Sequence, residues 1–192
     1  MRIFFGATLS ESTKTQIEKI QEELRNDIDD IRIEARQKLH ITLQFIGDFK
    51  PEKVESLFSS VRGEIERSRF KSPLTAVNGL SYFPNERVRR GVWIDCQDDG
   101  TLGAIAELIK SVTEKFGVIP EKREFKPHIT IARFRGEGDR NRKNYIDLQK
   151  LWSNGKLFIE RFFPKSIALF ESTLKASGSE YEILSHVPLI EG

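Results

Sequence analysis

Apolar positions along this chain recur with two periods, and these periods predict alternating strands and amphipathic helices in its first half. Strands are expected at residues 2–9, 38–46 and 73–82. Two apolar stripes at helical spacing predict the helices between them, one formed by Ile17, Ile20, Leu24 and Ile28 and the other by Val54, Leu57, Phe58, Val61 and Ile65. Ser10 or Ser12 can cap the first helix, and Pro51 suits the first turn of the second.

The second half repeats this order of elements. Strands are expected at residues 91–95 and 127–134, separated by a helix whose apolar stripe is Leu102, Ile105, Ile109, Val112 and Phe116. A polar stretch at 135–143 precedes a short helix that contains Tyr145, Leu148 and Trp152. Three more strands are expected near 156–162, 165–172 and 180–187. The predicted organisation is a single domain of residues 1–192, with repeat units of roughly 2–82 and 91–172.

The histidines support this duplication. Aligning Ile3 with Val92 places His40 on His128, at spacings of 37 and 36 residues. Both histidines lie in nearly identical strings, Leu-His-Ile-Thr-Leu at 39–43 and Pro-His-Ile-Thr-Ile at 127–131. The third histidine, His186, lacks this pattern, and we interpret it as a surface or edge-strand residue.

The His-x-Thr spacing has a structural meaning on a strand, where residues i and i+2 point to one face. His40 should therefore lie beside Thr42, and His128 beside Thr130, while Ile41, Leu43 and Phe45 face a core. Two such strands across a cleft would bring two imidazoles and two hydroxyls to one point. A histidine can act as acid or base near neutral pH, and a hydroxyl can bind a phosphate oxygen. The arrangement suits phosphodiester cleavage without a metal.

Two other interpretations are weighed against this one. A single strand histidine among apolar residues is more often a core or edge residue than a catalytic one. Two histidines without a cysteine, and without a carboxylate at a fixed offset in both motifs, form a poor zinc site. The pairing of the motifs favours an acid and a base.

Composition limits the remaining choices. The net charge of +2 means that an anion site must be local, and basic residues cluster at 87–90 and 133–143, with Arg36 just before the first motif. Such clusters are equally typical of solvated surface. Cys96 is the only cysteine, and no stretch is long and apolar enough for a signal peptide or a membrane span. Because the chain can form no internal disulfide and has neither of these segments, we expect a cytoplasmic protein. We expect no cofactor, because no cofactor motif such as a Walker-type glycine loop occurs.

The motifs resemble those of the 2H phosphoesterases, and more narrowly the bacterial and archaeal RNA 2′,3′-cyclic phosphodiesterases, also known as 2′-5′ RNA ligases. The resemblance covers nearly the whole chain and rests on residues 2–5, 40–47, 83–84, 89–93, 127–133, 170–174 and 181. It implies an α+β fold of two pseudo-symmetric lobes, each an antiparallel sheet backed by helices, with the His-x-Thr motifs in a central cleft.

The resemblance also implies roles for individual residues. His40 would be the general acid that protonates the O3′ leaving group, and His128 would be the general base that activates water. Thr42, Thr130 and Arg133 would bind phosphate oxygens, and Phe45 is a candidate for base stacking. Arg133 and Phe45 lie an odd number of residues from their histidines, so an ideal strand would point them away from the motif face. A twist or a bulge after Ala132, or a side chain reaching round the strand end, would be needed for Arg133.

The function expected is hydrolysis of RNA 2′,3′-cyclic phosphate ends to 2′-phosphates, with reversible 2′-5′ ligation as a side activity. The partner would be such an RNA, for example a tRNA fragment, with no metal and no membrane, and we expect a monomer. Two alternatives stay open: a phosphodiesterase for a small cyclic nucleotide, and a non-catalytic RNA-binding module.

Overall fold

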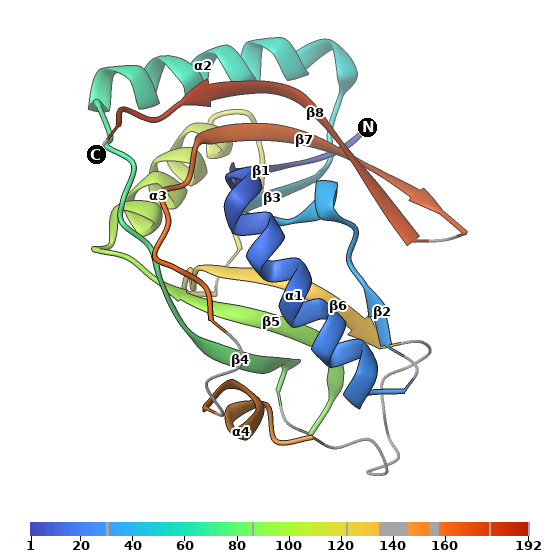
Figure 1. Cartoon of the computed structure of the whole chain (residues 1–192). Coiled ribbons are helices and arrows are strands. Elements are labelled where there is room, and N and C mark those ends of the chain that lie inside the picture. Colours follow the sequence, from blue (N-terminus) through green and yellow to red (C-terminus); the bar gives the residue numbers. More distant parts are fainter. Residues whose placement is uncertain are drawn as a thin grey trace.

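The computed structural model describes residues 1–29, 31–85, 87–121, 123–134, 146–153, 158–176 and 178–191. Within them the elements follow the order β1 (Arg2–Thr8), α1 (Glu11–Asp27), β2 (Ile31–Ile33), η1 (Arg36–Lys38), β3 (His40–Asp48), η2 (Pro51–Lys53), α2 (Val54–Ser68), β4 (Ala76–Pro84), β5 (Arg89–Gln97), α3 (Thr101–Glu114), β6 (His128–Phe134), α4 (Leu148–Ser153), β7 (Ser166–Lys175) and β8 (Gly178–Pro188). Figure 1 shows this path through the molecule.

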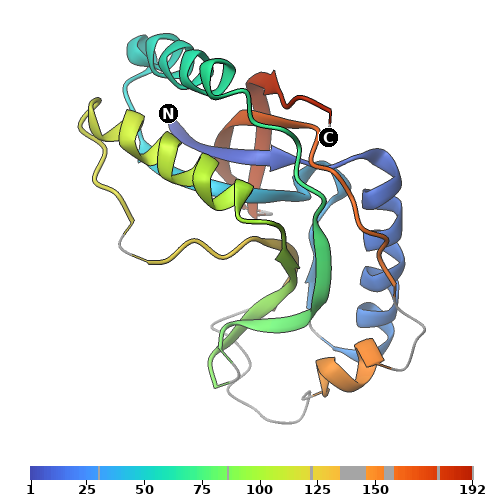
Figure 2. The same ribbon diagram turned by 90° about the vertical axis from the view of Figure 1, so that its left-hand side faces the viewer.

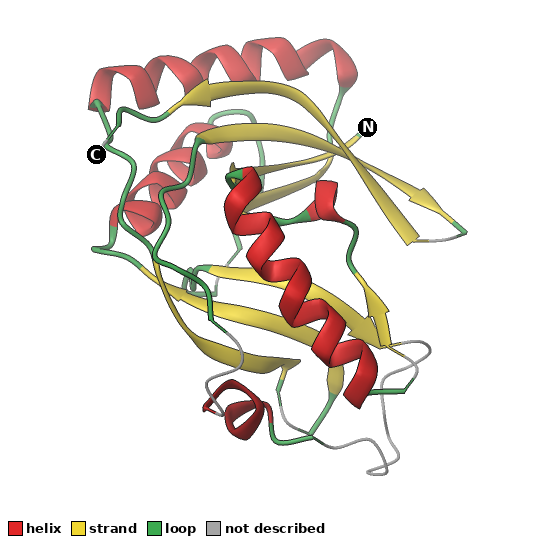
Figure 3. Cartoon of the chain, in the orientation of Figure 1, coloured by secondary structure: helices red, strands yellow, loops and turns green. Residues whose placement is uncertain are grey.

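The strands form an antiparallel sheet with the order β4-β5-β6-β3-β1-β7-β8, and β2 pairs with β6 beside this path. The helices lie outside the strands (Figure 3). The prediction of an α+β fold with antiparallel strands backed by helices is confirmed. Among the described residues, no helix is long and apolar enough to cross a membrane.

The strand order is symmetric about the junction between β6 and β3. Under the alignment of the two halves, β1 corresponds to β5, β3 to β6, and β4 to β7, and each pair lies equally far from this junction. We propose on this basis that residues 2–82 and 91–172 are duplicated units. A shared sheet explains why the two His-x-Thr motifs would lie on adjacent strands.

The helices cross over between the two halves. Helix α3, from the second half, packs on β3 of the first, whereas α1, from the first half, packs on β2 and β6. Helices α2 and α3 lie side by side (Figure 2). The buried face of α1 contains Ile17, Ile20 and Leu24, and that of α3 contains Leu102, Ile105 and Ile109. Each half therefore needs the other to bury its helix in the main core, and a smaller cluster of Phe4, Ala168 and Phe170 lies apart from that core.

Local sequence explains where α1 begins. The Ser10 side chain accepts a hydrogen bond from the Thr13 backbone N–H (3.1 Å), which satisfies one of the first unpaired amides of the helix.

Two details of the predicted elements are wrong. No strand forms over the described part of 156–162, where Phe162 makes only an isolated bridge to Thr75. Strand β2 is not among the predicted elements, because its three residues are too few to show a period. Tyr145 and the polar stretch from residue 135 to 143 lie outside the described residues.

Candidate active site

The two His-x-Thr motifs meet where β3 pairs with β6. The antiparallel register places Ile41 opposite Ile129, and both isoleucines are fully buried. In this register His40 lies beside Thr130, and Thr42 lies beside His128. All four polar residues are partly buried and alternate with the buried isoleucines, so they occupy the opposite face of the sheet. The structure thus brings together the four motif residues.

Each histidine is held by a backbone carbonyl two residues before it. The His40 Nδ1 atom lies 2.6 Å from the Lys38 carbonyl oxygen, and the His128 Nδ1 atom lies 2.7 Å from that of Lys126. Because a carbonyl only accepts, each Nδ1 carries a proton and Nε2 is the atom that can exchange one. The Thr42 hydroxyl is 2.9 Å from His40 Nε2, and donates to it when the ring is neutral.

Burial favours the neutral form of both imidazoles. Desolvation lowers the pKa of His40 from 6.5 to about 4, with smaller lowering by the charges of His128 and Arg133, against the raising effect of the Lys38 hydrogen bond. Burial also lowers the pKa of His128, while its bond to Lys126 and the charge of Asp95 raise it. The two rings are close enough for the charge of one to affect the other, which is typical of a paired acid–base site.

Aromatic side chains fix the planes of the two imidazoles. The His40 ring centroid lies 4.9 Å from that of Phe4, 5.2 Å from Phe170 and 5.5 Å from Tyr181. The His128 ring lies 4.2 Å from Trp93, which comes from the neighbouring strand β5. Rings packed at these distances limit rotation of the imidazoles and exclude water from one side of each.

Matching β-bulges change the strand parity after each motif. Along β3 the partners shift between Gly6↔Thr42 and Phe5↔Gln44, so Leu43 is an extra residue. Along β6 they shift between Trp93↔Thr130 and Val92↔Ala132, so Ile131 is the extra residue. Leu43 and Ile131 occupy equivalent places, three residues after their histidines.

The bulges place the fifth residue after each histidine on the motif face. On β6 this residue is Arg133, and the bulge that redirects it lies at Ile131 rather than after Ala132. On β3 it is Phe45, whose side chain is 54% exposed and lies 5.6 Å from the Phe4 ring. The expectation that Phe45 faces a core is therefore wrong, because that expectation assumed an unbroken alternation.

Arg133 lies on the motif face and is bound by a buried carboxylate. Its Nε atom lies 2.6 Å from Glu34 Oε1, and its guanidinium lies 5.3 Å from the centre of the Phe83 ring. Its positive charge contributes to the lowering of the His40 pKa. Burial raises the pKa of Tyr181, whereas the charge of Arg133 and a hydrogen bond with it have the opposite, smaller effect.

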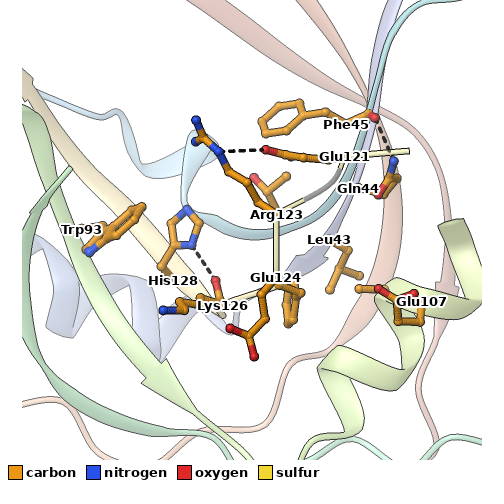
Figure 4. A pocket seen from close by; sticks show the side chains of 13 residues that line it. Leu43, Gln44, Phe45, Trp93, Glu107, Glu121, Arg123, Glu124, Lys126 and His128 are labelled. Atoms are coloured by element: carbon orange, nitrogen blue, oxygen red, sulfur yellow. Dashed lines mark hydrogen bonds and ion pairs between the residues drawn. The ribbon is translucent and has the colours of Figure 1, made fainter. Parts of the chain in front are cut away.

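A pocket of about 540 Å³ opens beside His128 (Figure 4). Thr42 and His128 line it together with the aromatic side chains of Phe45, Trp93 and Phe125. Charged side chains also line it, namely the carboxylates of Glu107, Glu121 and Glu124 and the cations of Arg123 and Lys126. A pocket with aromatic walls, polar edges and a reactive imidazole fits a nucleoside-sized molecule.

Other basic candidates lie away from the motif face or are already paired. Arg36 forms ion pairs with Glu11 and Glu18 of α1, so its side chain is directed to that helix. Arg89 lies 5.0 Å above the Tyr82 ring. His186 is exposed on the edge strand β8. Arg87 and Arg90 are exposed, and the candidates Arg135, Arg140, Arg142 and Lys143 lie outside the described residues.

Two residues near the site are not among those predicted from the sequence. Glu34 and Gln21 are 7% and 4% exposed, and both contact β6. Gln21 has a detectable signal, since it lies within the apolar stripe of α1, four residues after Ile17 and three before Leu24. No sequence signal marks Glu34, because strand β2, which ends just before it, is too short to be recognised from the sequence. In the described residues, no group of three or more histidine, cysteine or acidic side chains could hold a metal ion.

Comparison with known proteins identifies the class of this fold and site. The family described as LigT like phosphoesterase matches residues 8–94. An RNA 2′,3′-cyclic phosphodiesterase from Aeropyrum pernix is 30% identical over 153 residues, 79% of this chain and 82% of the relative. One from Methanocaldococcus jannaschii is 27% identical over 187 residues, 96% of this chain and 98% of the relative. A crystal structure of a Thermus thermophilus protein superposes with a TM-score of 0.79 at 24% identity, covering 100% of this chain and 99% of that one.

These similarities, on a fold whose two histidines converge, define the chain as a phosphoesterase, which is a hydrolase. More specifically, it belongs to the LigT-like family of 2H phosphoesterases.

Proposed function

We propose that the protein opens RNA 2′,3′-cyclic phosphate ends to 2′-phosphates by acid–base catalysis with His40 and His128, without a metal ion. The observation that carries this proposal is the junction of β3 and β6, where two imidazoles, two hydroxyls and a guanidinium share one face. The names of the relatives from Aeropyrum pernix and Methanocaldococcus jannaschii support the substrate class.

In the proposed reaction His128 is the general base. Its Nδ1–H is bound to the Lys126 carbonyl, so the lone pair on Nε2 can take a proton from water. The water oxygen then bonds to phosphorus as the bond between phosphorus and O3′ breaks. His40 gives its Nε2 proton to O3′, which leaves a 3′-hydroxyl and a 2′-phosphate. Thr42, Thr130 and Arg133 bind the non-bridging oxygens, where negative charge increases.

His40 must acquire the proton that it donates, since its low pKa leaves it neutral in the free protein. A bound phosphate anion beside Nε2 would favour the imidazolium and raise this pKa. Substrate binding would therefore protonate His40, while the proposed reaction requires a neutral His128. This coupling makes the pair share one proton in the bound state.

Phe45 and Trp93 would hold the terminal nucleoside in the pocket beside His128. Stacking on aromatic rings tolerates any base. The 2′-5′ ligation of tRNA halves would use the same site in reversible fashion, as a side activity, because water competes as the nucleophile. We propose that the protein acts as a cytoplasmic monomer.

The direct test is incubation with a short RNA that ends in a 2′,3′-cyclic phosphate, in the presence of EDTA. Chromatography against 2′- and 3′-phosphate standards should show only the 2′-phosphate. A 3′-phosphate would mean that the leaving oxygen is assigned wrongly. A 2′,3′-cyclic mononucleotide measured in parallel distinguishes the small-nucleotide alternative, which predicts faster turnover of the mononucleotide.

Removing either histidine should slow turnover strongly. His40→Ala and His128→Ala should each lower kcat by roughly 10²–10⁴-fold, the usual contribution of a positioned acid or base. His186→Ala is the matched control and should be as active as the unmodified protein. Full activity in either motif variant would contradict the mechanism, whereas RNA binding without any turnover in the unmodified protein would favour a binding module.

A further inference from the structure

Arg133 is anchored by a carboxylate that is much more deeply buried than the arginine itself. The Glu34 side chain is 8% exposed, that of Arg133 is 40% exposed, and Nε lies 2.6 Å from Oε1. A second cation, the Lys38 ammonium, lies 3.9 Å from the other carboxylate oxygen. A buried carboxylate is costly unless it is paired, so the pairing holds Arg133 in place. A bond through Nε also fixes the plane of the guanidinium, because its donors form a rigid fork.

The backbone of Glu34 is tied to the bulge in β6. Its N–H donates to the carbonyl oxygen of Ile131 at 2.9 Å. The Gln21 side-chain nitrogen donates to that same carbonyl at 2.8 Å, and to the Glu34 carbonyl at 2.9 Å. Gln21 of α1 therefore joins the bulge residue to the residue that binds Arg133.

These hydrogen bonds stabilise the bulge, because a bulge residue is displaced from the regular hydrogen-bond ladder between strands. The bulge at Ile131 is what turns Arg133 to the motif face, and two donors from outside β5 satisfy its carbonyl. A buried amide in an apolar stripe is unfavourable unless it is hydrogen-bonded. Leucine at position 21 would fit the stripe of α1, so the glutamine is explained by these two bonds rather than by core packing.

We infer that Glu34 and Gln21 are positioning residues that hold Arg133 at the phosphate site, Glu34 through the guanidinium and Gln21 through the bulge. The inference rests on the proposed function, in which Arg133 binds the phosphate. Neither residue touches the substrate. Their effect passes through the orientation of one side chain.

A double-mutant cycle tests the role of Glu34. Glu34→Ala should lower kcat/KM by roughly 10–100-fold, since a displacement of about 1 Å at a reacting site costs up to about 10²-fold. In the Arg133→Ala background the same substitution should change kcat/KM by less than about 3-fold, because the two residues act as one unit. Glu34→Gln should keep part of the activity, since its amide oxygen still accepts from Nε. An equal loss in both backgrounds would overturn the inference.

Gln21→Leu tests the link to the bulge, with Gln16→Leu as its matched control. Gln16 lies on the same helix and bonds to Glu160, away from the motifs. Gln21→Leu should lower kcat/KM by about 10-fold in the unmodified background and leave the Arg133→Ala variant unchanged, whereas Gln16→Leu should have no effect. A loss of the same size in the Arg133→Ala background would show a general structural role and would contradict the proposal.

Binding of inorganic phosphate separates this inference from the proposed function. Isothermal titration should give weaker phosphate binding for Glu34→Ala and Gln21→Leu, and neither substitution should weaken binding further in the Arg133→Ala background. This measurement needs no turnover. If the unmodified protein fails to cleave cyclic phosphate RNA, the proposed function fails, while unchanged phosphate affinity in the two variants would overturn the positioning role. Glu34→Gln replaces Glu34→Ala in the cycle if the alanine variant does not fold.

Discussion

At the scale of single residues, the environment of His40 determines its chemistry. Its ring is enclosed by Phe4, Phe170 and Tyr181, and Gly6 of β1 allows this close approach. A Cβ at Gly6 would lie 3.0 Å from His40 Cδ2 and 3.1 Å from the Ile41 carbonyl oxygen. The histidine at position 128 has a single aromatic neighbour among the described ring pairs, Trp93. The two imidazoles are thus chemically distinct in spite of their matching motifs.

The titration of His40 is the first prediction at this scale. NMR of the imidazole protons should show His40 titrating with a pKa of about 4 in the free protein. Inorganic phosphate should raise this pKa because an anion stabilises the imidazolium, and Arg133→Ala should raise it because a cation is removed. His186 provides a control resonance that neither change should affect. If the pKa of His40 changes neither when phosphate is added nor when Arg133 is replaced by alanine, the described geometry of the site is wrong.

At the scale of elements, the pairing of β5, β6 and β3 determines which side chains meet. The bulges at Leu43 and Ile131 each add one residue, and this addition reverses the faces of the residues that follow directly, Phe45 on β3 and Arg133 on β6. Gly91 permits the close contact of β5 with β6 just beyond the second bulge. A Cβ there would lie 2.3 Å from the Ala132 carbonyl oxygen and 2.6 Å from the Phe83 ring. Such an approach requires a shift of backbone.

Gly91→Ala should therefore destabilise the protein and weaken the site. The free energy of unfolding should fall by about 1–3 kcal/mol, as for an overpacked core, and kcat/KM should fall because Arg133 follows Ala132 directly. Urea denaturation and the turnover assay measure the two effects. Gly63→Ala in helix α2 is the control, and it should stabilise by about 0.5–1 kcal/mol without changing turnover. If Gly91→Ala behaves like Gly63→Ala, the close β5–β6 contact is refuted.

At the scale of the whole molecule, each half of the chain supplies a helix that covers a strand of the other half. Helix α1 covers β6 and helix α3 covers β3, so neither half has a full core alone. The motif face lies at the centre of this arrangement, on the two strands that join the halves. Burial of His40 at this junction couples its titration to global stability.

Stability should consequently fall as the pH falls from about 6.5 to 4. In this window the unfolded chain binds a proton at His40 while the folded state, with a pKa of about 4, does not. The unfolded state then binds more protons, so the free energy of unfolding decreases with falling pH, by at most about 1.4 kcal/mol per pH unit. The lowered pKa of His128 acts in the same direction. Urea denaturation at pH 7, 6 and 5 should show a smaller fall for His40→Gln than for the unmodified protein, and identical slopes would disprove the coupling.

The local pattern of residues determined the elements and the paired motifs of this protein. Apolar stripes such as Ile17, Ile20 and Leu24 depend on short-range periodicity, and His40 and Thr42 share a face because a strand has a period of two. The notable local failure was the strand expected at 156–162, where nothing in the period distinguishes a strand from an extended segment.

The surroundings of the motifs depend on contacts between segments that are far apart in the sequence. The face of Phe45 and Arg133 depends on bulges, which arise from pairing between strands distant in sequence. Arg36 was a candidate RNA contact by its position, and its partners on α1 became known only from the fold. The pKa of His40 and the roles of Glu34 and Gln21 likewise depend on burial and on contacts across the chain. The period of apolar residues indicates which face of a helix or strand a residue lies on. The residues that it contacts on that face depend on how the elements pack together.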